Sequence, residues 1–321
     1  MSPASFLRAA LAFACSAVLA LPTLAQDSEG EGAAASAATA PAQPMPAGET
    51  VAISVRHGGV FGSTITMTAQ VFRPAGEGPF PVVVFSHGRA PDAVDRLHLK
   101  VGVSRAQLHY WLARGNAVVS PIRPGYGATG GPDGENNGAH FNLGRCTTTP
   151  DYRRAANAAV RSVDATVAWL HTQPWADVHH VLLVGQSMGG LASVAAGARP
   201  AEGVVGYINF AGGGGGSPTL SPGHSCDPDQ LTSLYGEFGR STTVPSLWVY
   251  AMNDQYFGPD APVAWHESFA RGGSRTTFVH APALADGDGH GLSRHSRHLW
   301  APYVDSFLAT IDFPVAGAAR H

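Results

Sequence analysis

A short apolar run leads into a glycine-flanked serine near the middle of this chain. The run His179-His-Val-Leu-Leu-Val184 is followed by Gly185-Gln-Ser187-Met-Gly189-Gly190, and small residues with a helical pattern extend from Leu191 to Arg199. This order predicts a strand, a sharp turn and a helix, with Ser187 at the turn. Flanking glycines let the backbone turn without a Cβ clash and leave the serine hydroxyl accessible. Because about 0.3 such pentapeptides are expected by chance in this composition, the interpretation depends on the residues around it.

Apolar runs and helical patterns alternate along the rest of the chain. Strands are predicted at Val51 to Arg56, Thr64 to Arg73, Pro81 to Ser86, Ala117 to Ile122, Val181 to Val184, Val204 to Phe210, Ser246 to Ala251 and Arg275 to His280. Helices are predicted at Asp95 to Ala113, Tyr152 to His171, Met188 to Ala198, Pro228 to Phe238, Pro262 to Arg271 and Ser293 to Thr310. Buried runs separated by helices imply right-handed crossovers. The pattern therefore predicts an α/β fold in which a mostly parallel eight-stranded sheet, opened by an antiparallel pair, carries helices on both faces.

The N-terminal segment has the composition of a secretory signal. It carries one charge at Arg8, an apolar stretch, and small residues before an expected cleavage after Ala25. Residues 26–49 are rich in Ala, Pro, Gly and Glu and predict a flexible linker, followed by a folded domain over residues 50–321. We expect a secreted or periplasmic protein with no membrane attachment after cleavage, and an uncleaved anchor is the alternative.

Charge and cysteine content narrow the class of protein further. A formal net charge of −3 without a Lys/Arg cluster provides no electrostatic footprint for nucleic acid. Cys146 and Cys226 are the two cysteines outside the signal segment, and an even pair in an exported protein predicts a disulfide, with two unlinked buried thiols as the alternative. His290, His295 and His298 lack the acidic or cysteine partners of a recognisable zinc signature. We expect a monomer that needs no metal.

Candidates for the partners of a nucleophilic serine lie just after the predicted strands, where an α/β sheet places its ligand sites. His290, in a glycine-rich loop after the last strand, is the candidate base. Asp254 follows the strand that ends at Ala251 and is the candidate acid, because it completes the order Ser187, Asp254, His290. An Asn-Asp turn is the alternative reading of that position. Three other aspartates remain open as the acid: Asp260, Asp286 and Asp288.

An acyl-transfer site also needs backbone donors for a developing oxyanion. The N–H of Met188, directly after Ser187, is one candidate, and the N–H of Arg89 in the loop after Ser86-His87-Gly88 is the other. The Arg89 side chain is not needed for that role, and His87 is expected to orient the loop. Aromatic residues near strand ends are candidates for the pocket wall: Tyr126, Tyr256 and Phe257.

Taken together, these motifs resemble those of the α/β-hydrolase superfamily. The chain is similar, over roughly residues 60 to 312, to exported dienelactone-hydrolase-like and prolyl-oligopeptidase-like serine esterases. The motifs that carry the resemblance are Ser86-His87-Gly88, Pro124-Gly-Tyr-Gly127, Gly185-Gln-Ser187-Met-Gly189-Gly190, Asn253-Asp254-Gln-Tyr-Phe257 and Asp288-Gly-His290. The resemblance implies a triad of Ser187, Asp254 and His290. Dienelactone hydrolases proper have a cysteine where Ser187 stands, and the β-propeller of the oligopeptidases is missing.

The sequence therefore predicts an esterase that cleaves small-molecule carboxylic esters through an acyl-enzyme, without a metal or organic cofactor. Two alternatives remain. One is a serine peptidase or amidase of the prolyl-oligopeptidase type with the same triad. The other is a catalytically silent hydrolase fold that serves as a binding protein.

Overall fold

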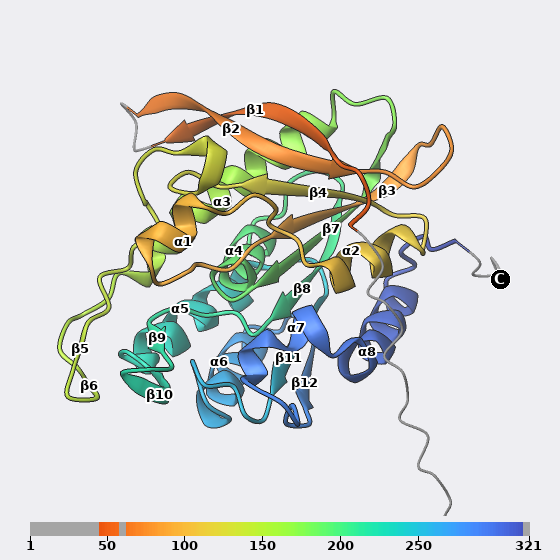
Figure 1. Cartoon of the computed structure of the whole chain (residues 1–321). Coiled ribbons are helices and arrows are strands. Elements are labelled where there is room, and N and C mark those ends of the chain that lie inside the picture. Colours follow the sequence, from red (N-terminus) through yellow and green to blue (C-terminus); the bar gives the residue numbers. More distant parts are fainter. Residues whose placement is uncertain (1–44, 58–61, 317–321) are drawn as a thin grey trace, which may run out of the picture. The chain divides into compact units, whose positions relative to one another are not determined.

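The computed structural model describes residues 45–57 and 62–316, and its main feature is one eight-stranded sheet (Figure 1). In sheet order the strands are β1 (Glu49–His57), β2 (Ser63–Phe72), β4 (Ala117–Ile122), β3 (Phe80–Ser86), β7 (Ala176–Gln186), β8 (Val204–Phe210), β11 (Ser246–Ala251) and β12 (Thr276–Ala281). β2 runs antiparallel to β1 and β4, and all other neighbours are parallel. The predicted fold class is confirmed, including the antiparallel opening pair.

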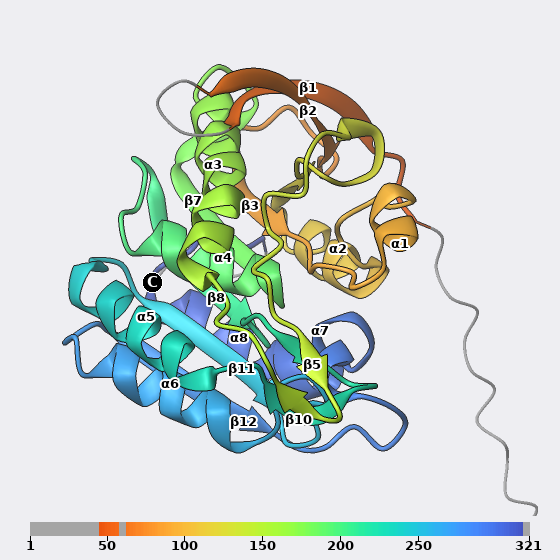
Figure 2. The same ribbon diagram turned by 90° about the vertical axis from the view of Figure 1, so that its left-hand side faces the viewer.

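Helices cover both faces of the sheet. They are α1 (Ala93–Leu97), α2 (Arg105–Leu112), α3 (Tyr152–Leu170), α4 (Met188–Gly197), α5 (Pro228–Ser241), α6 (Asp260–Ala270), α7 (Leu292–His295) and α8 (Arg297–Thr310). Figure 2 shows α3, α4, α5 and α6 on one side of the sheet and α2, α7 and α8 on the other. The helices expected from the sequence thus supply the two outer layers.

Two hydrophobic cores follow from the period-two alternation of the strands. In β3, Val82 and Val84 join the core beneath α3 and α4, whereas Val83 and Phe85 join the core beneath α2 and α8. Side chains on both faces of the central strands are buried, which is why these strands read as continuous apolar runs.

The predicted helix from Asp95 to Ala113 is wrong in its middle. The structure has two separate helices, α1 and α2, and residues 98–104 between them are not helical. Ser104 begins α2, because its hydroxyl accepts a hydrogen bond from the N–H of Gln107 at 3.3 Å. Gly102 packs so tightly that a Cβ would lie 2.6 Å from Ser120 Oγ. This close packing holds the segment against the end of the sheet, where it lines the cavity described below.

The predicted final helix is also divided, into α7 and α8, at Ser296 (φ −102°, ψ 59°). Several short elements were not predicted from the sequence: β5 (Phe141–Asn142), β6 (Arg145–Cys146), β9 (Gly216–Ser217), β10 (Ser221–Ser225) and the 3₁₀ turns η1 (Gly127–Thr129) and η2 (Gly289–Gly291). Two-residue strands give too short a pattern to be recognised from alternation.

The predicted signal segment, residues 1–25, and most of the predicted linker, residues 26–49, lie outside the described residues. β1 already begins at Glu49. Among the helices of residues 45–57 and 62–316, none combines the length and the apolar character that a membrane span requires.

Candidate active site

Ser187 lies at a sharp turn between β7 and α4. It has φ 58° and ψ −123°, a left-handed conformation that is unusual for a residue with a Cβ. A Cβ on Gly185 would lie 1.9 Å from the carbonyl oxygen of Gly189, and a Cβ on Gly189 would lie 2.0 Å from that of Ser86. Both glycines are therefore required by close backbone approach. Ser187 N–H also donates to Phe210 O at 2.9 Å, which fixes the turn against β8.

Asp254 and His290 form a buried pair. Asp254 Oδ2 accepts a hydrogen bond from His290 Nδ1 at 3.0 Å, and the two side chains are 0% and 6% exposed. The other carboxylate oxygen, Oδ1, accepts from the backbone N–H groups of Tyr256 (2.8 Å) and Phe257 (3.1 Å). Because a carboxylate can only accept, the proton of the neutral imidazole lies on Nδ1 and Nε2 carries the lone pair.

Further hydrogen bonds join the loop that carries Asp254 to the loop that carries His290. Asn253 Nδ2 donates to the carbonyl oxygens of Leu284 and Gly287, both at 3.1 Å. Asp288 Oδ1 accepts from the backbone N–H groups of Gln255 and His290, both at 2.8 Å. These contacts fix the position of Asp254 relative to His290.

The structure also places the three aspartates that the sequence left open as acids. Asp288 binds backbone N–H groups through Oδ1, as described above. Asp260 is exposed at the start of α6, and Asp286 is exposed in the loop before η2. The carboxylate that contacts the His290 ring is that of Asp254.

His87 holds the loop after β3. Its Nδ1 donates to the carbonyl oxygen of Gly88 at 2.7 Å, and its Nε2 accepts from the N–H of Arg123 at 3.3 Å. Burial, assisted by the charge of Arg123, lowers the pKa of His87 well below its ordinary value, so the ring stays neutral. The carbonyl of Gly88 and the N–H of Arg89 belong to one planar peptide unit and point in opposite directions. The bond from His87 therefore also fixes the direction of the Arg89 N–H.

A buried ion pair lies behind His87. Arg123 Nε donates to Glu135 Oε1 at 2.5 Å, and both side chains are almost fully buried. Tyr126 donates its hydroxyl to Glu135 Oε2 at 2.7 Å and contacts the His87 ring edge-on, with centroids 4.5 Å apart. Burial raises the pKa of Tyr126, which keeps the phenol protonated as a donor. Tyr126 thus supports the loop from behind.

A cavity of about 350 Å³ lies at the carboxyl ends of β3 and β7. Its lining includes Ser187, His290, Tyr256, Gly88 and Arg89, with further residues from 99–104. Tyr126 and Phe257, predicted as pocket walls, are not part of the lining. Tyr126 is turned to Glu135, and Phe257 is 2% exposed and packs against Trp265. Of the three aromatic candidates, Tyr256 alone lines the cavity.

Met188, the predicted backbone donor after the nucleophile, is the first residue of α4. The first N–H groups of a helix have no acceptor within it, so the Met188 N–H is available to a ligand at Ser187. Gly88 lies directly beside the turn, since a Cβ on it would lie 3.2 Å from Ser187 Cβ. The two candidate donors therefore flank the serine.

Gln186 and Arg294 are polar residues of the cavity that were not singled out in the sequence. Gln186, which precedes Ser187, donates through Nε2 to His290 O at 3.1 Å. Its Oε1 accepts from Arg294 Nη2 at 3.2 Å. Gln186 sits inside the serine motif and could have been considered, whereas Arg294 follows His290 by four residues and gave no motif signal.

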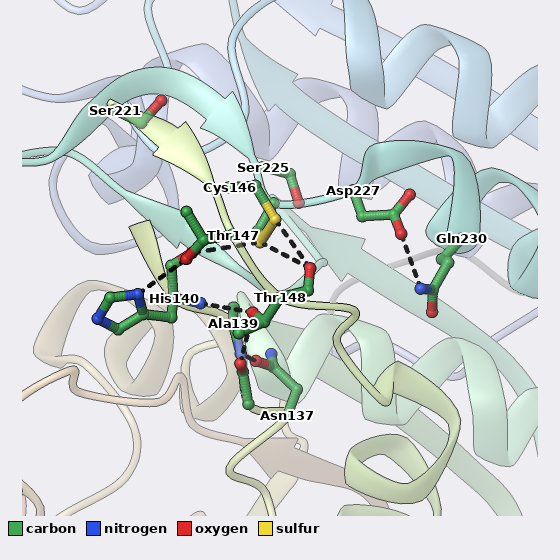
Figure 3. The surroundings of a disulfide bond; sticks show 12 residues. Asn137, Ala139, His140, Cys146, Thr147, Thr148, Ser221, Ser225, Asp227 and Gln230 are labelled. Atoms are coloured by element: carbon green, nitrogen blue, oxygen red, sulfur yellow. Dashed lines mark hydrogen bonds between the residues drawn. A yellow bond between two sulfur atoms is a disulfide. The ribbon is translucent and has the colours of Figure 1, made fainter. Parts of the chain in front are cut away.

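Cys146 and Cys226 are joined in a disulfide with Cα atoms 5.0 Å apart, as the even pair of cysteines predicts (Figure 3). The disulfide links the β5–β6 hairpin to the segment after β10. Strands β9 and β10 form a second hairpin, which lies beside the β5–β6 hairpin in Figures 1 and 2. The N–H of Cys226 donates to Gly215 O at 2.9 Å, and the N–H of Gly223 donates to Gln255 O at 2.7 Å. The disulfide is therefore connected, through β10, to the loop that carries Asp254.

Removal of this disulfide is expected to lower stability substantially. It closes a loop of 80 residues, and the chain-entropy relation gives about 4.5 kcal/mol for that length. The Cys146→Ala/Cys226→Ala double variant should unfold about 10 °C below the wild type in a thermal melt, given about 2 to 4 °C per kcal/mol for a domain of this size. Wild type melted with a reductant should match the double variant. A melting temperature within 2 °C of the oxidised wild type would contradict this expectation.

Among the described residues, no group of three or more histidine, cysteine, aspartate or glutamate side chains is arranged to hold a metal ion. A second hollow of about 450 Å³, between α3 and α5, is lined mainly by polar residues and contains none of the predicted site residues.

Comparison with known proteins relates the fold to solved structures. No protein-family model matches the chain. No curated protein matches it in sequence. An esterase of Pyrococcus furiosus superposes with a TM-score of 0.54 at 12% identity, covering 82% of this chain and 90% of the esterase. A dienelactone hydrolase of Klebsiella pneumoniae superposes with a TM-score of 0.51 at 16% identity, covering 83% of this chain and 99% of the hydrolase.

An acylaminoacyl peptidase of Pyrococcus horikoshii gives a TM-score of 0.53 at 12% identity, covering 86% of this chain and 44% of the peptidase. The chain thus spans less than half the length of that peptidase. These three proteins share the α/β-hydrolase fold, and the strand order described above is that of the same fold. The chain has the α/β-hydrolase fold.

Proposed function

We propose that this protein is a serine hydrolase that cleaves carboxylic esters through an acyl-enzyme. The observation that carries the proposal is the Asp254–His290 hydrogen bond in the same cavity as Ser187, whose hydroxyl stands at a strained turn. Strained backbone of this kind persists where the surrounding structure imposes it and is concentrated at functional sites.

In the proposed reaction, Ser187 Oγ attacks the ester carbonyl carbon while His290 Nε2 accepts the serine proton. Asp254 holds the imidazole in the tautomer that has its lone pair on Nε2 and stabilises the imidazolium that forms. The imidazolium then returns the proton to the departing alcohol. Water repeats these steps on the acyl-enzyme and releases the acid, which regenerates Ser187.

The proposed oxyanion donors are the backbone N–H groups of Met188 and Arg89. Met188 offers the free N–H of a helix start, and the Arg89 N–H is held in direction by His87 through the Gly88 carbonyl. The neutral state of His87 suits an orienting role, because its two ring nitrogens are both engaged with backbone groups.

The preference for esters over amides rests on the comparisons. The esterase and the dienelactone hydrolase are matched over nearly their full lengths, whereas the peptidase is matched over less than half. A peptidase or amidase that uses the same three residues is the second candidate, and a silent binding protein is the third.

The direct test is mass spectrometry of the purified protein after treatment with a reactive fluorophosphonate. This reagent reports an activated serine without any assumption about the substrate. We expect a single adduct, on Ser187, and turnover of short-chain nitrophenyl esters that exceeds turnover of the matching anilides. Faster anilide turnover would favour the amidase, and a folded protein without an adduct would favour the binding protein.

The charges of the cavity favour an ester that carries a negative group. Arg89 and Arg294 both line the cavity, and the described lining includes no aspartate or glutamate. Arg89 Nη2 is paired with Asp133 at 2.5 Å, a carboxylate that Arg96 shares at 3.4 Å, whereas Arg294 contacts the neutral amide of Gln186. Arg89 and Arg96 share one carboxylate, and the contact of Arg294 is an uncharged amide. The positive charges at the cavity are therefore only partly balanced.

Arg294→Gln is accordingly expected to raise KM for a carboxylate-bearing ester about fivefold, with little change for a neutral ester of the same size. The difference should shrink at high salt, since Arg294 is exposed to solvent. Arg297→Gln, an exposed arginine of α8, serves as the control. Equal effects of Arg294→Gln on both esters would show that Arg294 does not select charge.

We also propose export to an oxidising compartment. The signal-like segment at residues 1–25 and the Cys146–Cys226 disulfide are both typical of secreted or periplasmic proteins.

A further inference from the structure

Tyr256 contacts both the acid and the base of the proposed triad. Its backbone N–H donates to Asp254 Oδ1 at 2.8 Å. Its ring stacks on the imidazole of His290, with centroids 4.0 Å apart and planes inclined by 25°. It also lines the cavity, so the stacked pair borders the space next to Ser187.

A second aromatic ring restrains His290 from another direction. Phe257 meets the imidazole edge-on, with centroids 5.2 Å apart and planes at 79°. The hydrogen bond that His290 Nδ1 donates to Asp254 restrains this nitrogen but does not by itself fix the tilt of the imidazole plane. The parallel contact and the edge-on contact together restrain this tilt and thereby the direction in which Nε2 points.

We propose that Tyr256 is a positioning residue for His290, which holds the imidazole plane by stacking and stabilises the imidazolium formed when Ser187 loses its proton. This inference rests on the proposed function. The face of an aromatic ring carries partial negative charge and attracts a cation more strongly than a neutral group. The stack therefore strengthens as the proton moves from Ser187 Oγ to His290 Nε2, and it favours the transition state over the resting state.

Tyr256 packs against β9, and its phenol is neutral. A Cβ on Gly216 of β9 would lie 2.8 Å from Tyr256 Cβ, so β9 packs directly against this residue. β9 is adjacent to Gly215, whose carbonyl accepts from Cys226, so the disulfide supports the position of Tyr256. Burial raises the pKa of the Tyr256 phenol above its ordinary value, and no phenolate forms near neutral pH.

The test compares Tyr256→Phe, which keeps the ring, with Tyr256→Leu, which removes it. Both variants retain the backbone N–H that binds Asp254, so only the side chain is altered. The readouts are kcat and KM as a function of pH for one neutral ester, with melting temperatures to establish that each variant is folded. Tyr303→Leu, an exposed tyrosine of α8, is the matched control.

We expect Tyr303→Leu to stay within twofold of the wild type. Tyr256→Phe should keep the pH dependence of the wild type, because the stacking ring is retained. Tyr256→Leu should lower the plateau of kcat by about fivefold, the size of one ring–cation contact, with KM nearly unchanged. Its activity should also persist to lower pH, by about 0.7 of a pH unit, because the imidazolium loses the same stabilisation. The charged groups around His290, namely Asp254, Asp288 and Arg294, are unchanged in this comparison.

The inference is supported if Tyr256→Leu lowers the plateau of kcat and also displaces the acid limb of the pH–rate profile, where activity falls with falling pH, to lower pH. A merely structural role would lower the plateau without moving the limb, and that result would overturn it. Tyr256→Leu with wild-type kinetics would overturn it as well. Failure of the proposed function looks different, because the wild type would then turn over neither esters nor amides.

Discussion

Replacement of Ser187 by alanine is expected to lower kcat for ester hydrolysis by on the order of 10⁶, because the bond-forming atom is removed. Fluorophosphonate labelling should disappear in the same variant. The fold should be unaffected, since the turn is imposed by Gly185 and Gly189 and by the hydrogen bond to Phe210 rather than by the hydroxyl. The measurement is steady-state turnover of a nitrophenyl ester, with a thermal melt of each protein.

Two further variants sharpen that experiment. Ser187→Gly should be equally inactive yet unfold at a higher temperature, because glycine relieves a positive φ that costs about 1 to 3 kcal/mol in other residues. Ser193→Ala, a buried serine on α4 that donates to Gly189 O, should remain active. Activity of Ser187→Ala above a few per cent of the wild type would remove Ser187 from the mechanism.

The central strands could be predicted closely from the sequence, because burial on both faces of a parallel sheet leaves an uninterrupted apolar run. The predicted bounds of Ala117 to Ile122, Val204 to Phe210 and Ser246 to Ala251 coincide with β4, β8 and β11. Turn residues on each side of these runs make their ends visible.

The segment between β3 and β4 could not be predicted in the same way. Residues 95–113 were predicted as one long helix, but Leu99, Val101 and Val103 line a cavity at the end of the sheet instead. That choice depends on tertiary packing of Gly102 against His87 and Ser120, which no local pattern encodes.

The candidate site was predictable where a motif sits at the end of a strand. Ser187 and His290 lie in glycine-rich turns, and Asp254 directly follows a buried strand. The wall of the cavity was less predictable. Tyr256 and Phe257 are adjacent in sequence and face different surroundings, and Tyr126 is turned away by a glutamate nine residues later. Which face of a loop residue meets the cavity is decided by contacts distant in sequence.

Replacement of Asp254 by asparagine is expected to lower kcat by about 10⁴-fold while leaving the backbone in place. The structure gives the reason in atomic terms. Oδ1 of Asp254 accepts two backbone N–H groups, so in the variant the amide oxygen has to occupy that position. The amide NH₂ then faces His290 Nδ1 as a donor. The imidazole is forced to carry its proton on Nε2, where it can no longer accept one from Ser187.

The matched controls follow from where the other aspartates lie. Asp260→Asn, at an exposed site on α6, should stay within twofold of the wild type. Asp288→Asn should lose much less activity than Asp254→Asn, because an amide oxygen can still accept from the N–H groups of Gln255 and His290. A larger loss in Asp260→Asn than in Asp254→Asn would show that the acid is misassigned. Since all three changes remove one negative charge, the expected ranking separates control of the imidazole tautomer from a general effect of charge.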